Sequence, residues 1–154
     1  MPAPDPARHR RIVDAARQGL ASPDRRGEVV SGDVRASWQR CERTLPNRAT
    51  APVELADPRD AWASSPIRVA AGALVDELAS LATREDYVAA ITDPVGRILW
   101  SSAGRDMVRR AERASFVCGA NWNERLAGTN APGLVLETGR PAAVFATEHW
   151  CDSV

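Results

Sequence analysis

The sequence contains no lysine, so its 20 basic residues are all arginines, and 20 acidic residues balance them. The formal net charge is zero, which argues against the strongly basic surface of a nucleic-acid-binding domain. Together with the abundant alanine, the lack of lysine is typical of the codon bias of a high-GC genome. We therefore give the arginine content no functional weight and expect no direct contact with nucleic acid.

Cysteine and long apolar runs are also scarce. The three cysteines, Cys41, Cys118 and Cys151, are odd in number and form no Cys-x-x-Cys pair. A disulfide framework is therefore not expected, and a reducing cytoplasm is the simplest location. No apolar run reaches the roughly 18 residues of a transmembrane helix, and the N-terminus lacks the apolar core of a secretory signal. We expect a cytoplasmic protein without membrane contact.

The residues that are present suit one domain with a helical extension, since 44% of the 154 residues are hydrophobic. We assign residues 1–65 to a helical N-terminal extension and connector, and residues 66–154 to the domain. Apolar spacing predicts a first helix from Asp5 to Gly19, and a second from about Asp33 to Leu45. The inner face of the second helix is predicted from spacings of four, three and four residues: Val34, Trp38, Cys41 and Leu45.

In the domain, a short helix is expected after Pro58, and the longest helix begins at Ser65-Pro66 and runs to about residue 81. Strands are predicted at 87–92 and 97–101, joined by an Asp-Pro-Val-Gly turn in which the glycine adopts positive φ. A charged helix is expected over about 104–114. A second short helix, 131–137, ends at Gly139 and leads into a buried strand at about 141–146.

Three groups of residues, in order along the chain, resemble the GAF-type sensor domain of bacterial transcription regulators, a group that includes acetoin-catabolism and dihydroxyacetone-operon activators. The similarity covers about residues 28 to 150. Its motifs are Ser37-Trp38-Gln39-Arg40-Cys41, the hairpin from Ile91 to Leu99, and a C-terminal pattern of Trp122, Glu124, Gly128-Thr129-Asn130-Ala131, Thr138-Gly139-Arg140-Pro141, Val144-Phe145 and Glu148-His149.

The resemblance implies an α+β fold: a GAF-like antiparallel sheet with packed helices, preceded by the helical extension. In that family, another hairpin normally follows the Glu-His position. Because the sequence stops at Val154, we expect the domain to be incomplete at its C-terminus, as in a truncated gene product or a fragment. The missing strands would form one wall of the ligand pocket.

The resemblance also implies a small organic ligand held between the sheet and the loop-helix layer. The candidate lining residues are Trp122, Asn123, Thr129, Asn130, Phe145 and His149. An indole offers a large apolar area and one donor. For Thr129 and Asn130 taken individually, capping of the following helix is the better interpretation. No cofactor and no catalytic residue is expected.

Two catalytic or metal-binding alternatives are weaker. His149, Cys151 and Asp152, with Cys118 or Glu148, could hold zinc, but their spacing lacks the two close pairs of a structural site. A Cys-His hydrolase would need sequence neighbours to converge on one reacting atom. No Gly-x-Ser-x-Gly elbow or phosphate loop is present.

The stripe around Trp38 is consistent with either core packing or a dimer contact. The arginine-rich helix at residues 8–17 carries Asp14 and no helix-turn-helix pattern, so it is interpreted as a solvated face. The favoured hypothesis is a small-molecule-sensing module of a transcription regulator that works with the parent regulator's other domains or as a homo-oligomer. The alternative is a helical dimerisation or protein-interaction module without a pocket.

Overall fold

The computed structural model describes residues 7, 10–11, 15, 30–45 and 50–150. Most of the helix expected between Asp5 and Gly19 lies outside these residues, as do Cys151 and Asp152. The elements of the described part are α2 (Gly32–Thr44), α3 (Pro58–Ala63), α4 (Pro66–Ala70), α5 (Gly72–Glu85), β1 (Val88–Thr92), β2 (Ile98–Ala103), α6 (Arg105–Arg113), α7 (Glu124–Ala127), α8 (Ala131–Thr138) and a 3-10 turn (Ala146–Glu148). This mixture confirms the α+β class.

Strands β1 and β2 form an antiparallel hairpin, as the sequence predicted. Asp93 organises its turn, because its Oδ1 atom accepts from the backbone N–H groups of Val95 at 3.0 Å and Arg97 at 2.9 Å. Gly96 has a φ of 95°, which glycine adopts without steric cost. The turn chemistry that was visible in the sequence therefore sets the register of the sheet.

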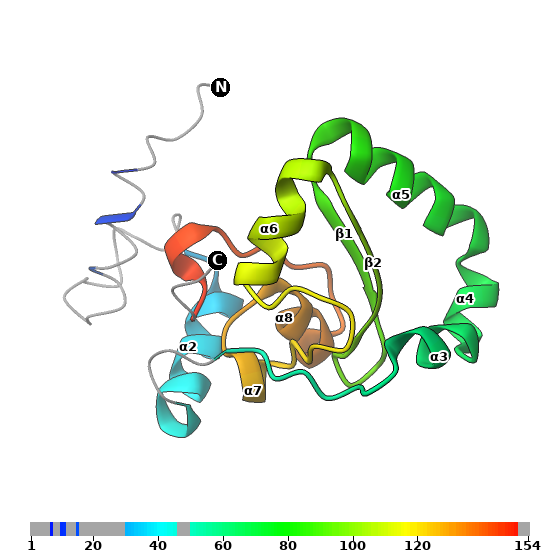
Figure 1. Ribbon diagram of the computed structural model, residues 1–154. Helices are drawn as coiled ribbons and strands as arrows, with labels where there is room; N and C mark the ends of the chain where they lie inside the picture. The colour runs from blue at the N-terminus through cyan, green and yellow to red at the C-terminus, as the bar shows by residue number, and fades with distance from the viewer. Residues whose placement is uncertain (1–6, 8–9, 12–14, 16–29, 46–49, 151–154) are drawn as a thin grey trace.

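The two-stranded sheet lies between α5 and α6, and α3 packs against β2 (Figure 1). Trp62 of α3 meets Trp100 of β2 with ring centroids 6.4 Å apart. The long helix expected over residues 66–81 is two helices in the structure. The helical geometry is interrupted at Ala71, whose φ and ψ are −99° and 7°, and α5 starts afresh at Gly72.

A buried cluster forms where residues 117–122 run beside the start of β2. Ile98 donates to the Ala120 carbonyl at 2.9 Å, and Trp122 donates to the Gly96 carbonyl at 2.8 Å. The cluster consists of Ala51, Ile98, Ala120, Trp122 and Ala127. It holds the segment before α7 against the hairpin, and so fixes where α7 begins.

A second buried cluster forms where α2 packs on α7 and α8. Its members are Val30, Val34, Trp38, Cys41, Leu134 and Trp150. Trp38 is only 7% exposed, and its indole Nε1 donates to the Glu148 carbonyl at 2.8 Å. Of the two interpretations of the Trp38 stripe, core packing within one chain is the one that the structure confirms. The division of the chain at residue 65 stays a prediction.

The strand expected at about 141–146 is wrong. Residues 141–145 have no regular structure, and Ala146–Glu148 form a 3-10 turn. Ala142 and Val144 pack against the α2 cluster, while Phe145 is 63% exposed. Partly buried and exposed side chains therefore do alternate, but the α2 cluster rather than a neighbouring strand covers the partly buried side. In the described residues, no helix has the length and apolar character needed to cross a membrane.

Candidate functional site

Side-chain caps position the two helices that face α2. The Asn123 Oδ1 atom accepts from the Arg125 backbone N–H at 3.0 Å and starts α7. The Asn130 Oδ1 atom accepts from the Gly133 N–H at 2.7 Å and starts α8. These bonds satisfy amides that a helix leaves unpaired at its N-terminus. The predicted capping role of Asn130 is confirmed, and both α7 and the α7–α8 loop (residues 128–130) begin or end at a residue with a defined capping role.

Gly128, in the loop between α7 and α8, is in close contact with Trp150 from the C-terminal segment. Gly128 has a φ of 75°, and a Cβ atom built on it would overlap the Cβ, Cγ and Cδ1 atoms of Trp150. The Trp150 backbone N–H donates to the Thr129 carbonyl at 3.0 Å. Only glycine allows the indole to lie this close to the loop. Packing by Trp150 therefore fixes the backbone on which the Thr129 side chain stands.

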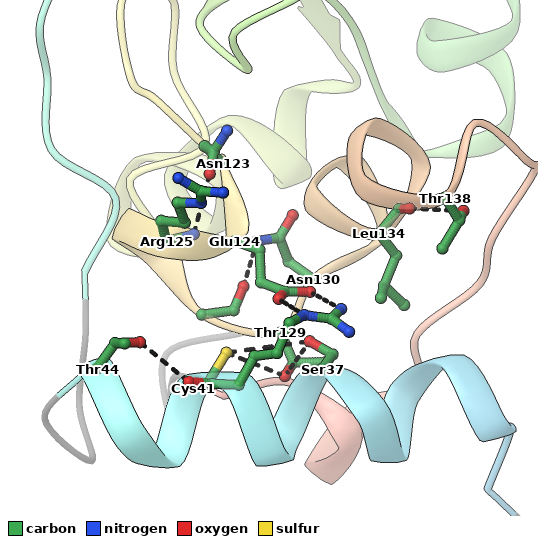
Figure 2. A network of polar contacts seen from close by, with 12 residues as sticks. Ser37, Cys41, Thr44, Asn123, Glu124, Arg125, Thr129, Asn130, Leu134 and Thr138 are labelled. Atoms are coloured by element: carbon green, nitrogen blue, oxygen red, sulfur yellow. Dashed lines mark hydrogen bonds and ion pairs between the residues drawn. The ribbon is translucent and has the colours of Figure 1, made fainter.

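Thr129 points its hydroxyl at α2 rather than capping α8 (Figure 2). Its Oγ1 atom lies 2.7 Å from Ser37 Oγ and 3.7 Å from Cys41 Sγ. All three side chains are buried, with relative exposures of 0% to 1%. A buried hydroxyl needs a partner to offset its lost hydration. Each of these groups therefore depends on α2 and the loop staying together.

Beside the hydroxyls, an ion pair joins α2 to the first residue of α7. The Arg40 guanidinium donates two hydrogen bonds to the Glu124 carboxylate, from Nε to Oε1 at 2.6 Å and from Nη2 to Oε2 at 2.8 Å. The Glu124 side chain is 6% exposed, whereas that of Arg40 is 41% exposed. A two-bond pairing of this kind has a defined geometry as well as strength. We call Ser37, Arg40, Cys41, Glu124 and Thr129 the α2 joint.

The electrostatics of the α2 joint follow from these contacts. Burial acts to raise the pKa of Glu124, but the hydrogen bonds from Arg40 and Ser37, together with the Arg40 charge, outweigh burial, so the pKa lies below its ordinary value. The hydrogen bond to Glu124 raises the pKa of Arg40. Burial raises the pKa of the Cys41 thiol. At neutral pH the joint therefore contains one ion pair and a neutral thiol.

A cavity of about 500 Å³ opens beside the joint. Its lining residues are Arg40, Cys41, Arg43, Thr44, Glu124, Arg125 and Glu137. In Figure 2, Cys41 and Thr44 of α2 face α7, which carries Glu124 and Arg125. The volume is in the range of small-molecule sites. The joint and the cavity share three residues, so a molecule in the cavity would touch the groups that hold α2.

None of the six side chains predicted to bind a ligand lines this cavity. Trp122 is 2% exposed, its Nε1 donates to the Ser115 carbonyl at 3.1 Å, and it packs edge-on against Phe116. Thr129 belongs to the joint, while Asn123 and Asn130 are caps. Phe145 faces solvent, and His149 is half-buried. The structure brings Thr129 and Asn130 together in the α7–α8 loop and leaves Trp122 in the other cluster.

Arg40 and Glu124 were not among the candidate site residues predicted from the sequence. Both residues stand in motifs that carried the family resemblance, but 84 positions separate them. No local spacing rule predicts a pairing at that distance. The signal in the sequence is that Arg40 is next to Cys41 and Glu124 is one helical turn before Ala127, two apolar residues that the structure buries.

Of the residues considered for catalysis or metal binding, the structure describes Cys118, Glu148 and His149. Cys118 Sγ lies 3.3 Å from Ser101 Oγ. Over residues 30–45 and 50–150, no three His, Cys, Asp or Glu side chains gather into a group that could hold a metal ion. Two members of the zinc set considered from the sequence, Cys151 and Asp152, fall outside the described part.

Residues 8–154 match the protein family described as MimR, N-terminal domain. Two relatives are named propane 2-monooxygenase operon transcriptional activator MimR. The protein from Mycolicibacterium smegmatis is 30% identical over 139 residues, which cover 88% of this chain and 23% of that protein. The protein from Mycolicibacterium goodii is 29% identical over 144 residues, which cover 90% and 24%. Both are named as activators rather than enzymes, and the chain spans about a quarter of their length.

Two further similarities were found. A 47.3 kDa uncharacterized protein from the thcA 5' region of Rhodococcus erythropolis is 39% identical over 61 residues, covering 40% of this chain and 14% of that protein. Among solved structures, the crystal structure of the E. coli DhaR(N)–DhaL complex contains a chain with a TM-score of 0.67 and 21% identity. That match covers 79% of this chain and 43% of the other, and at this identity it supports the fold alone.

Proposed function

Since the chain belongs to the family of MimR N-terminal domains, we propose that it is the signal-receiving module of a transcriptional activator and that it binds a small organic molecule. The family match confirms the relationship to regulator N-terminal domains that the sequence motifs predicted. Regulation requires two states that a ligand binds with different affinity. The proposal places the difference between these states at the α2 joint.

The observation that carries this proposal is the position of the cavity. Arg40, Cys41 and Glu124 line the cavity and also hold α2 against α7 and the loop that follows it. A ligand that packs on these groups stabilises the α2 joint. When the ligand leaves, the joint depends mainly on the Arg40–Glu124 pair, in which the Arg40 side chain is partly exposed. A small molecule there can shift the position or stability of α2 by a local change in contacts. The sequence-based assignment of ligand contacts stays a prediction for these six residues: Trp122, Asn123, Thr129, Asn130, Phe145 and His149.

The relatives suggest which neutral probes to try first. MimR is named as the activator of a propane 2-monooxygenase operon, and such an enzyme places oxygen on the central carbon of propane. We therefore choose three uncharged test compounds, called the neutral panel: propan-2-ol, acetone and propane-1,2-diol. A ligand that binds only the folded state raises stability by about 2.7 kcal/mol at a concentration one hundred times its Kd. We expect at least one small organic compound to raise the unfolding temperature.

The control is a pair of matched variants. Thr44→Tyr places a large ring at the rim of the cavity, whereas Thr83→Tyr places one on the exposed face of α5. Each threonine donates to the carbonyl four residues earlier in its helix, at 3.1 Å and 2.9 Å, so both variants lose an equivalent bond. Thr44→Tyr should abolish the shift and Thr83→Tyr should keep it. The proposal is overturned if neither the neutral panel nor the carboxylates described below raise the unfolding temperature.

A second candidate function is a protein-interaction or homodimerisation module. Apolar side chains are exposed on α4 and α5: Val69 at 87%, Leu74 at 53% and Leu81 at 40%. The structurally similar DhaR(N) chain was crystallised in a complex with DhaL. Sedimentation velocity would favour this function if it showed a tight dimer that ignores every small molecule tested and dissociates in Leu74→Asp. A monomer that binds a ligand would argue against it.

A further inference from the structure

Two arginine side chains on the cavity wall lack a bonded partner. Arg43 comes from the last turn of α2 and Arg125 from α7. Within the described residues, neither guanidinium takes part in a hydrogen bond or an ion pair, although both line the cavity. The third arginine of the wall, Arg40, is bound to Glu124. Two guanidinium groups without a bonded partner, one from α2 and one from α7, therefore line the same cavity.

Fewer groups on the cavity wall repel an anion than attract one. Glu124 is neutralised by Arg40, which leaves Glu137 as the one other acidic group of the wall. The last turn of α2 also ends near the cavity, and exposed helix carbonyls repel an anion. One of those carbonyls is already bonded, because the Leu45 N–H donates to the Cys41 carbonyl. Two arginines against one glutamate leave the wall positive.

The size and chemistry of the wall select the kind of anion. At about 500 Å³ the cavity exceeds the volume of a bare inorganic ion and lies within the usual range for organic ligands. The methylene stems of arginines and the neutral Cys41 thiol offer apolar contact. Guanidinium groups recognise carboxylates with paired hydrogen bonds.

We propose that this cavity binds a small organic carboxylate whose charged end bridges Arg43 and Arg125 and so ties α2 to α7. The inference rests on the sensing function proposed above and names its ligand class. A carboxylate held in this way adds a second charged link beside the Arg40–Glu124 pair. Binding would then lock the α2 joint, which is the state change that the sensing function requires.

The experiment is a heteronuclear NMR titration of the labelled chain with sodium propionate, with sodium chloride at matched ionic strength as reference. Propionate should move the amide signals of residues 40–44 and 124–127 in a saturable manner, with smaller changes in chloride. Arg43→Ala and Arg125→Ala should each raise the apparent Kd about tenfold, since each removes a charge-assisted pair. Arg125→Lys should retain part of the affinity because it keeps the charge.

The matched control is Arg109→Ala, which removes an exposed arginine of α6 away from the cavity and should leave the Kd unchanged. Equal effects of all three alanine variants would mean general charge screening and would overturn the inference. Shifts no larger in propionate than in chloride would also overturn it. If the neutral panel raises the unfolding temperature while propionate binds nowhere, the sensing function stands and the carboxylate assignment falls. If neither class binds, both fail.

Discussion

At the scale of single residues, Glu124 is a buried carboxylate that stays charged because Arg40 and Ser37 bond to it. Its pKa in the fold lies below the ordinary value of 4.5, so the ionised form favours folding. The resulting stability is fully present above that ordinary value, and it is lost as the pH falls through the lower pKa of the folded state.

Glu124→Gln should therefore lower the unfolding free energy at about pH 7 by about 1–2 kcal/mol, a discounted figure because Arg40 is partly hydrated. Urea unfolding at about pH 7 and about pH 3.5 measures the difference. At the lower pH the gap between variant and parent should shrink, because below its ordinary pKa of 4.5 Glu124 takes up a proton in the unfolded state, which favours unfolding of the parent. Asp106→Asn, at an exposed position of α6, is the control. A gap that is independent of pH would contradict the role given to the ion pair.

At the scale of elements, α2 is attached to the α7–α8 loop by side chains rather than by backbone pairing. The Ser37–Thr129 contact at 2.7 Å is the shortest buried link between them. A double-mutant cycle of Ser37→Ala and Thr129→Val should give a coupling energy of about 0.5–1.5 kcal/mol, the usual net value of such a bond. Urea unfolding of the four proteins provides the measurement.

A cycle of Ser37→Ala with Thr83→Val supplies the reference, because Thr83 is exposed on α5. Its coupling should be within about 0.3 kcal/mol of zero. If the Ser37–Thr129 cycle also gave no coupling, the hydroxyl contact would not contribute to holding α2.

Elements also differ in how well local chemistry predicts them. The hairpin was predictable because Asp93 bonds to residues two and four positions away and Gly96 adopts the positive φ that the turn needs. The segment 141–146 was not, since an alternating apolar pattern is satisfied by any surface that covers alternate side chains. Here that surface is the α2 cluster rather than a strand. The break of the expected 66–81 helix at Ala71 likewise has no counterpart in the local pattern of apolar residues.

At the scale of the whole molecule, residues from both ends of the described chain share one core. Val34, Trp38 and Cys41 pack with Leu134 and Trp150. A chain that begins at Thr50 should therefore lose its cooperative thermal transition and its near-ultraviolet circular dichroism, and should bind a hydrophobic dye.

A chain beginning at Glu28, which keeps α2, is the comparison and should unfold in one transition. If the shorter chain unfolded as sharply and at the same temperature, α2 would not be required for the stability of the fold. The predicted division between an extension at 1–65 and a domain at 66–154 would then gain support.

The sequence by itself determined the helix of α2, the hairpin and its turn, and the start of α8 at Asn130, because capping, turn and periodicity energies act between near neighbours. Its motifs also placed the chain among the N-terminal domains of transcription regulators. Only the tertiary structure decided that Arg40 meets Glu124, that Thr129 faces Ser37, and that a cavity opens beside them. Those contacts join residues more than 80 positions apart, and their partners are set by how the helices pack rather than by any pattern along the chain.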